Sequence, residues 1–318
     1  MTSKTKKTIA FSIAAILIIV ASFILFFSSR TSQNTLSAER NQGVLGELLI
    51  DSVPQYVVIR PGLMFKLDTG SDYSAITERD LHFLDSLGFK ATESYYPILG
   101  RNGRGDVKLK TKRYTLSLPL YMWDTTTDSL GNIRQNCNYN ASNVLANVDF
   151  VPASTEFSVL GIDFIEKFIV EFRSNENMLA LYFDEPDGYE MCERLERSQS
   201  PVYWPFIGHR YYMDASVDSN LGRYFFDTGM QKAFVHRPMK DLPTDLRNSK
   251  QDSVTSLRGT FYAVGDRNGW LQIGDREGKE TIYYFDNDEE EYSINPLNMR
   301  DNIDLLFNFP AQQIGFKY

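Results

Sequence analysis

The chain is poor in the side chains that bind metal ions, with two cysteines and three histidines among its 318 residues. Neither a Cys-x-x-Cys nor a His-x-x-x-His spacing occurs, and such spacings are typical of zinc sites. We therefore expect neither a metal ion nor another cofactor. Cys137 and Cys192 could form one disulfide if the folded part lies outside the cytoplasm, but their separation in sequence does not decide this.

Positive charge is also scarce, since 33 Lys and Arg residues face 41 Asp and Glu residues and the formal net charge is −8. Proteins that bind nucleic acids need clustered Lys and Arg to contact phosphates. The run from Lys108 to Arg113 is short, and its charges alternate with Leu109 and Thr111, a pattern typical of a solvated strand face. The composition therefore excludes nucleic acid as an expected partner.

Helical patterns are few, whereas hydrophobic residues (42%) and aromatic residues (14%) are plentiful enough for a packed core. One clear helix is expected over Thr77–Leu87, with Thr77 as its cap and Gly88 at its end. The class is therefore mostly β with small helices. Strands are predicted at Tyr56–Arg60, Leu63–Leu67, Tyr114–Met122, Phe168–Phe172, Leu179–Phe183, Tyr224–Phe226 and Thr281–Phe285.

The longest hydrophobic run, Ile9–Phe27, contains nineteen residues without a charge. As a helix it would be about 28 Å long, close to the thickness of the hydrocarbon layer of a membrane. Lysines precede the run, which predicts a cytoplasmic N-terminus at residues 1–8, an anchor at 9–27 and a polar tether at 28–43. A cleaved signal peptide is the alternative, although the run is longer than a usual signal core.

An internal repeat divides the remainder of the chain. Phe65–Gly70 and Tyr224–Gly229 each place Asp-Thr-Gly after an apolar strand. Each half also contains a Gly-rich segment midway, Ile98–Gly105 in the first and Ala263–Gly269 in the second. We therefore expect one β unit to occur twice, as a lobe at residues 44–190 and a second lobe at residues 191–318.

Two Asp-Thr-Gly loops suit a particular chemistry when symmetry brings them face to face. Glycine allows a second segment to approach closely, and a threonine hydroxyl can bond to the partner loop. Two adjacent carboxyl groups cannot both ionise easily, so Asp68 and Asp227 would share one proton. The ionised group can then take a proton from water while the protonated group donates to a substrate carbonyl.

The segments Leu67–Ser71 and Val159–Phe164 resemble the aspartic proteases of the pepsin and retropepsin type. Ser74–Thr77, which leads into the predicted helix, is similar to bacterial retropepsin-like proteins in particular. The resemblance implies a bilobal pepsin-like β fold with two pseudo-symmetric lobes behind an N-terminal transmembrane helix. It also implies a monomer, because one chain supplies both aspartates.

The resemblance assigns roles to individual residues. Asp68 and Asp227 would be the catalytic pair, and the first Gly-rich segment would be a flap over the substrate. The residues expected to support the pair are Thr69, Gly70, Ser71, Thr228 and Gly229, with Ser71 placed to bond the outer oxygen of Asp68. The candidate flap residues are Gly100, Arg101, Asn102 and Gly103.

Two departures from the family pattern concern the second half. Met230 stands where the family has Ser or Thr, and Pro296–Asn302 lacks a counterpart of Gly161. The expected function is a membrane-anchored aspartic endopeptidase that acts on polypeptides outside the cytoplasm, at a bacterial inner membrane facing the periplasm. The alternatives are a peptide-binding protein that has lost catalysis and a structural envelope protein in which the repeat serves packing.

Overall fold

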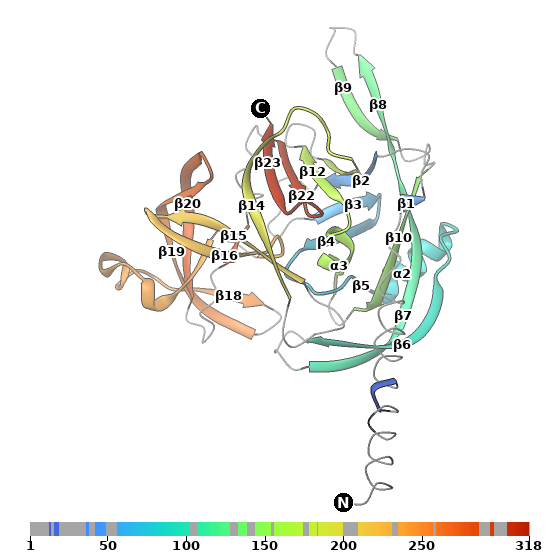
Figure 1. The fold of residues 1–318 in the computed structure, drawn as a ribbon, viewed down its shortest axis with the longest axis horizontal. Coiled ribbons are helices and arrows are strands. Elements are labelled where there is room, and N and C mark those ends of the chain that lie inside the picture. Colours follow the sequence, from blue (N-terminus) through green and yellow to red (C-terminus); the bar gives the residue numbers. More distant parts are fainter. Residues whose placement is uncertain are drawn as a thin grey trace, which may run out of the picture.

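The computed structural model describes residues 13, 16–18, 36–37, 42–48, 56–101, 107–127, 133–138, 144–153, 156–173, 178–182, 184–199, 209–230, 235–256, 259–285, 293–295 and 304–317. Strands dominate these residues, so the predicted mostly-β class is confirmed. Hydrogen bonds join 21 of the strands into one sheet, and β8 and β9 form a separate 2-stranded sheet. Figure 1 shows the strands of the second half, from β15 to β20, gathered on one side of the molecule.

Among the described residues from Leu36 to Tyr182 there are two short helices, α2 (Glu78–Ser86) and α3 (Ile162–Ile165). Its strands are β1 (Leu36–Ser37), β2 (Gln42–Leu48), β3 (Tyr56–Arg60), β4 (Leu63–Asp68), β5 (Ala75–Ile76), β6 (Thr92–Arg101), β7 (Val107–Leu120), β8 (Met122–Thr127), β9 (Ile133–Asn138), β10 (Val144–Pro152), β11 (Ser158–Gly161), β12 (Ile169–Arg173) and β13 (Met178–Tyr182).

The described part of the second half contains two single-turn 3₁₀ helices, η1 (Met239–Asp241) and η2 (Thr244–Leu246). Its strands are β14 (Glu190–Gln199), β15 (His209–Val217), β16 (Asn220–Phe226), β17 (Val235–Pro238), β18 (Asp252–Ser256), β19 (Gly259–Ile273), β20 (Arg276–Phe285), β21 (Ser293–Ile294), β22 (Asp304–Asn308) and β23 (Gln313–Lys317).

Helix α2 confirms the predicted helix. A side-chain hydrogen bond joins it to β11, the strand beside the first Asp-Thr-Gly loop. The Thr77 hydroxyl accepts the backbone N–H of Asp80, and Gly88 follows the helix with φ of 90°. Asp80 is buried, and its carboxylate accepts a hydrogen bond from Ser158 Oγ at 2.6 Å. Because Ser158 begins β11, this bond fixes the helix against β11.

The two halves use the same scheme of strand pairing. In the first half β4 pairs antiparallel with β3 and parallel with β11, which pairs antiparallel with β5. In the second half β16 pairs antiparallel with β15 and parallel with β21, which pairs antiparallel with β17. Each half also has one more parallel pair, β5 with β10 and β17 with β20. The sequence repeat therefore corresponds to a repeated topology.

The Gly-rich segments do not correspond in this scheme. The described part of the first, Ile98–Arg101, ends β6 and pairs with β7, whereas Ala263–Gly269 lies within the long strand β19 and pairs with β20. At a bulge between Asp266 and Gly269 the chain leaves no room for a side chain on Gly269, because a Cβ there would be 2.1 Å from Cγ1 of Ile282. The counterpart of β6–β7 is hairpin β18–β19, and Figure 1 shows both hairpins directed towards the middle of the molecule.

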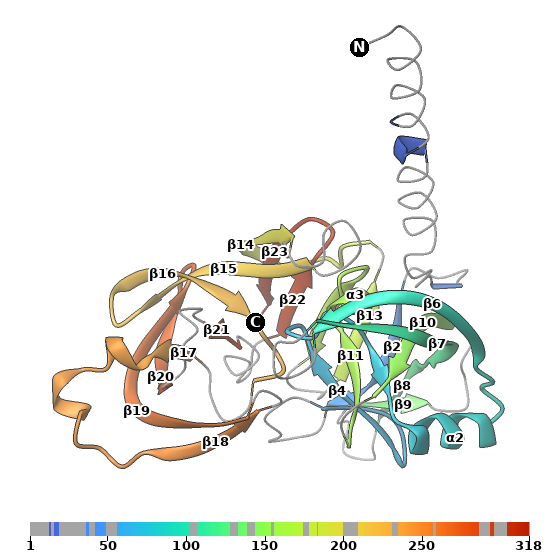
Figure 2. The ribbon, with the colours of Figure 1, turned by 90° about the horizontal axis from the view of Figure 1, so that it is seen from below.

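Strands from both halves meet in a central sheet. β12 of the first half pairs with β22 of the second, and β22 pairs with β23. β23 pairs in turn with β14, which also pairs with β15. Figure 2 shows β22 and β23 between the two groups of strands. The two Asp-Thr-Gly strands are therefore held by one continuous network of backbone hydrogen bonds.

A shared aromatic cluster fills the space below the second loop. Phe307 of β22 is fully buried, and its ring centroid lies 5.2 Å from that of Phe172 and 4.9 Å from that of Phe226. Phe309 packs against the same ring at 6.1 Å. Because Phe226 directly precedes Asp227, this cluster connects the core of the first half to the position of the second aspartate.

The predicted membrane anchor lies almost entirely outside the described residues. Four of its residues, Ile13, Ile16, Leu17 and Ile18, are described, and they are helical and exposed. Within the ranges given above, no helix combines the length and the hydropathy that crossing a membrane requires. The side chains of Cys137 and Cys192 are also outside the described part, although their backbones lie in β9 and β14.

Replacing Phe307 with alanine should destabilise the protein by about 3–5 kcal/mol, because it leaves a cavity between Phe172 and Phe226. Denaturant unfolding of the full chain measures this change. Phe157→Ala is the matched control, since Phe157 is 44% exposed and loses less buried surface. An equal loss of stability in both variants would contradict the role given to this cluster.

Candidate active site

Both predicted aspartates lie where an apolar strand ends. Asp68 is the last residue of β4, and Asp227 directly follows β16. The parallel partner of each strand passes beside the loop, so that Gly161 of β11 lies opposite Asp68 and Ile294 of β21 lies opposite Phe226. Each loop is therefore flanked by a parallel strand in the same way.

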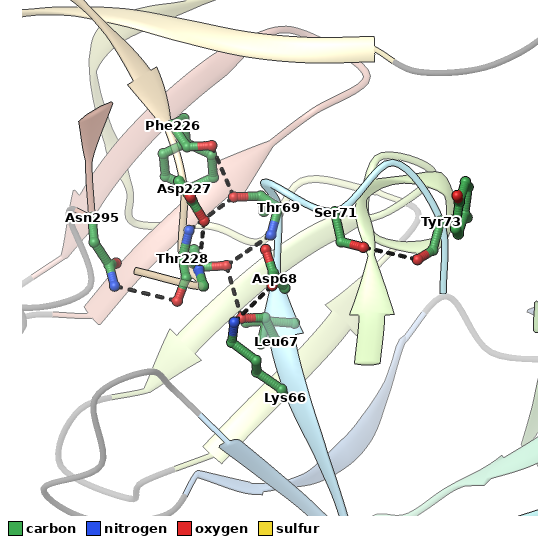
Figure 3. Close-up of polar contacts among 11 residues, drawn as sticks. Lys66, Leu67, Asp68, Thr69, Ser71, Tyr73, Phe226, Asp227, Thr228 and Asn295 are labelled. Atoms are coloured by element: carbon green, nitrogen blue, oxygen red, sulfur yellow. Dashed lines mark hydrogen bonds and ion pairs between the residues drawn. The ribbon is translucent and has the colours of Figure 1, made fainter. Parts of the chain in front are cut away.

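Reciprocal hydrogen bonds between the threonines join the two loops (Figure 3). The backbone N–H of Thr69 donates to Oγ1 of Thr228, and the N–H of Thr228 donates to Oγ1 of Thr69, both at 3.0 Å. The Thr69 hydroxyl donates to the Phe226 carbonyl at 3.0 Å, and the Thr228 hydroxyl donates to the Leu67 carbonyl at 3.2 Å. Both threonines are buried, so these four bonds are shielded from water.

Each glycine lies directly against the aspartate of the opposite loop. A Cβ added to Gly70 would be 2.7 Å from Cγ of Asp227, and one added to Gly229 would be 2.3 Å from Cγ of Asp68. No larger residue fits at either position without moving a carboxyl group. The two glycines thus allow both carboxyl groups to approach the pseudo-twofold axis.

The pair is accessible to solvent on one side. Asp68 is 8% exposed, Asp227 is half-buried, and Gly70 is exposed. Gly229 and both threonines are buried beneath them. A small molecule or an extended chain could therefore reach the carboxyl groups from the side of Gly70.

Lys66 is a member of the site that the sequence analysis missed. Its Nζ lies 2.8 Å from Oδ2 of Asp68, and its side chain is only 16% exposed. Figure 3 shows this contact beside the threonine bonds. Alternation along a strand could have revealed it, because side chains two residues apart point to the same face.

The ammonium group of Lys66 remains charged in this position. Burial by itself would lower the pKa of Lys66, but the charge and hydrogen bond of Asp68 and the charge of Asp227 together raise it above its ordinary value. The site therefore contains one cation beside two carboxyl groups.

Ser71 does not fulfil its predicted role. Its hydroxyl donates to the carbonyl oxygen of Tyr73 at 3.0 Å, and Figure 3 shows it pointing away from the pair. The expected bond to the outer oxygen of Asp68 is therefore replaced by the contact with Lys66. The tight turn after the loop brings the Tyr73 carbonyl close to Ser71, which explains the difference.

On the second loop, Asp227 accepts the backbone N–H of Gly229 at 2.8 Å, while Met230 is buried at 4% exposure. The strand beside this loop is β21 rather than Pro296–Asn302, which lies outside the described residues. Continuing its register from Ile294 places Asn295 at the position that Gly161 occupies in the first half. Asn295 Nδ2 donates to the Thr228 carbonyl at 3.3 Å, so an amide supports the second loop there.

The candidate flap is described only in part. Gly100 and Arg101 are the last residues of β6 and pair with Lys108 and Val107 of β7. Asn102 and Gly103 lie outside the described residues. The described part therefore places two of the four candidates at the end of a hairpin.

Asp163 supports the first loop from behind. Its Oδ1 accepts both the backbone N–H of Ser74 at 2.7 Å and the Ser74 hydroxyl at 2.9 Å, and Ser74 is fully buried. Burial of the carboxyl group raises the pKa of Asp163 to about 7, although the bonds from Ser74 and the charge of Lys167 oppose this increase. Ser74 Oγ also accepts the backbone N–H of Gly161 at 3.0 Å, which extends the network to β11.

Comparisons with known proteins do not assign the chain to a family. No protein-family model matches it, and no curated protein matches it. Among solved structures it is similar to basic 7S globulin from soybean, with a TM-score of 0.43 and 8% sequence identity over 87% of this chain and 96% of that chain. A similarity this weak supports no conclusion about fold or function.

These findings correct the assignment to the pepsin and retropepsin family. No family model and no curated protein supports that assignment. We therefore do not assign the chain to that family.

Thr69→Val should destabilise the protein by about 1–3 kcal/mol, because it leaves the Thr228 N–H and the Phe226 carbonyl buried without their partner. Thr69→Ser keeps the hydroxyl and is the matched control. Denaturant unfolding of both variants measures the difference, and the pair Thr228→Val and Thr228→Ser repeats the test on the other loop. Equal stability of the Val and Ser variants would contradict the proposed bonding.

The raised pKa of Asp163 should make the free energy of unfolding depend on pH in a direction that is unusual for a carboxyl group. Its pKa in the folded chain, about 7, lies above the ordinary value of 3.8, so between these values the folded state binds more protons than the unfolded state. The contribution of Asp163 to stability should therefore fall as the pH rises through this window. Asp163→Asn keeps the acceptor oxygen for Ser74 and removes the titration.

The free energy of unfolding of the parent chain and of Asp163→Asn should be measured at several pH values between about 4 and 7. We expect the parent to lose stability relative to the variant as the pH rises. A difference that stays constant over this range would contradict the assigned titration.

Proposed function

We propose that the chain is an aspartic endopeptidase, which hydrolyses peptide bonds with Asp68, Asp227 and an activated water. The observation that carries the proposal is the reciprocal packing of the loops, in which each glycine lies against the aspartate of the other loop. Two carboxyl groups held in this way form an acid and a base when they share one proton. The exposed side of the pair suits a substrate that approaches as an extended polypeptide.

The reaction proceeds without a covalent enzyme adduct. The ionised aspartate takes a proton from water as the water oxygen bonds to the carbonyl carbon, and the protonated aspartate donates its proton to the carbonyl oxygen. The tetrahedral diol then breaks its C–N bond. The amine nitrogen takes the proton gained from water, and the other aspartate regains its proton from a diol hydroxyl. Water and one peptide bond are consumed, and one acid and one amine are formed.

The same proposal covers the two lobes, the oligomeric state and the membrane anchor of the chain. The repeated strand pairing supports two related lobes, each of which supplies one aspartate, so a monomer suffices for catalysis. The uncharged run 9–27 supports a single-pass anchor with the catalytic part outside the cytoplasm. The substrate would then be a polypeptide near the outer surface of that membrane.

A peptide-binding protein without catalysis is the second candidate. The ion pair between Lys66 and Asp68 favours it, because a permanent cation beside one carboxyl group changes the charge available to the pair. Met230, which offers no hydroxyl to Asp227, favours it as well. Such a protein would hold a peptide at the same loops and leave it intact.

Asp68→Asn and Asp227→Asn should each lower the rate of cleavage by roughly 10²- to 10⁴-fold or more, because each removes one partner of the acid–base pair. The full chain in detergent is incubated with a diverse peptide pool from about pH 3 to about pH 8, where two carboxyl groups can share a proton. Mass spectrometry identifies the products.

Asp85→Asn is the matched control, because Asp85 is an exposed carboxylate on α2. It should cleave at the parental rate. Cleavage that survives in either dyad variant would disprove the proposal. Binding of peptides by the parent without cleavage at any pH would favour the second candidate.

A further inference from the structure

The ammonium group of Lys66 lies where a substrate of the pair would meet it. Lys66 and Asp68 share one face of β4, and the Lys66 Nζ is 2.8 Å from Oδ2 of Asp68. The charges of Asp68 and Asp227 both act on this ammonium group and raise its pKa. The side chains of Lys66 and Asp68 are 16% and 11% exposed, so both remain partly accessible. A polypeptide bound at the pair therefore has a cation directly beside the bond to be cleaved.

The same ammonium group has donors for a further partner. An ammonium group carries three N–H donors and no acceptor. In the described part of the chain the hydrogen-bond partner of Lys66 is Asp68 alone, so one of the three donors is used. Donors of a partly buried cation favour acceptor oxygens, and ionised acceptors bind them most strongly. Lys66 can therefore bind an acceptor on a substrate while it keeps its contact with Asp68.

Two aromatic side chains lie next to Lys66 on the side away from the loop. Tyr56 is the direct partner of Lys66 on β3, and Val159 is its partner on β11. Phe157 directly precedes β11, and its ring centroid lies 5.7 Å from that of Tyr56. Phe157 is 44% exposed and Tyr56 is half-buried. The cation is therefore followed by an apolar surface that a substrate side chain can reach.

A cation beside an apolar surface fits a side chain with an apolar stem and an acidic end. The methylene groups of a glutamate can pack on the aromatic rings while its carboxylate reaches the Lys66 ammonium group. Burial raises the pKa of Tyr56, so its phenol is uncharged at acid and neutral pH and does not repel the carboxylate. Two carboxyl groups that share one proton carry one negative charge, which the charge of Lys66 balances.

From this arrangement we propose that Lys66 binds an acidic side chain of the substrate, so that the chain cleaves polypeptides beside glutamate or aspartate. The proposal deepens the proposed peptidase function and rests on it. Since Lys66 belongs to β4, the preference that it causes concerns the substrate residue on the first-lobe side of the scissile bond.

Two peptide pools test the proposal, and they are identical except for a central residue that is Glu in one pool and Gln in the other. The full chain in detergent is incubated with each pool at about pH 6, where a glutamate side chain is ionised. Mass spectrometry counts the cuts directly beside the central residue. The parent should cut beside Glu at least roughly tenfold more often than beside Gln, because the bond to Lys66 then joins two charged groups.

Variants of Lys66 separate this contact from other effects of the charge. Lys66→Met removes the cation and should abolish the preference for Glu, whereas Lys66→Arg keeps the cation and should retain it. A change in the charge beside the pair acts on both pools alike, so the ratio between the pools isolates the contact with the substrate. Lys90→Met is the matched control, because Lys90 is an exposed lysine that follows α2, and it should keep the parental ratio.

Thermal unfolding verifies that each variant is folded, and Lys66→Gln replaces Lys66→Met if the latter is not. A second readout does not depend on cleavage. Immobilised Asp227→Asn chain keeps Lys66 and Asp68, and it should retain more of the Glu pool than of the Gln pool. Adding Lys66→Met to this variant should remove the difference.

Equal cleavage of the two pools by the parent would overturn the proposal and leave the peptidase function standing. So would a preference for Glu that survives in Lys66→Met. If the parent cleaves neither pool while the excess retention of the Glu pool depends on Lys66, the peptidase function fails and the acidic binding site stands. Neither cleavage nor a difference in retention would end both proposals.

Discussion

The reciprocal bonds between Thr69 and Thr228 are the constraint on which the site depends. Each threonine uses both its N–H and its hydroxyl on the other loop, so neither loop can move without breaking buried hydrogen bonds. Gly70 and Gly229 are required because the same closeness leaves no room for a Cβ. The central sheet of β12, β22, β23 and β14 holds the two loop-bearing halves in this arrangement.

The bonding framework is symmetric, whereas the described contacts of the two aspartates differ. Lys66 contacts Asp68 on one side, while Asp227 accepts the Gly229 N–H and follows an apolar strand on the other. The symmetric loops bring the carboxyl groups together, and Lys66 places one positive charge against the Asp68 carboxylate.

Duplication made the central part of the site predictable, because two Asp-Thr-Gly triplets after apolar strands indicate a pair whichever fold contains them. Helix α2 was predictable because Thr77 and Gly88 mark its ends locally. The position of Asn295 was not, since β21 has two residues and lacks the glycine of its counterpart. The bond of Ser71 depends on a turn that brings the Tyr73 carbonyl to it, which no local pattern specifies. Strand alternation alone could have identified Lys66 as a neighbour of Asp68. The family assignment rested on short motifs and failed.

The most direct test of the account is the affinity for a non-cleavable peptide that carries a hydroxyl-bearing tetrahedral carbon in place of the scissile carbonyl. It imitates the diol that Asp68 and Asp227 would bind during hydrolysis. An enzyme binds such a mimic at least about 10²-fold more tightly than the matching peptide, and we predict this for the parent chain. The preference should disappear in Asp68→Asn. Equal affinity for the two ligands in the parent would contradict catalysis by this pair.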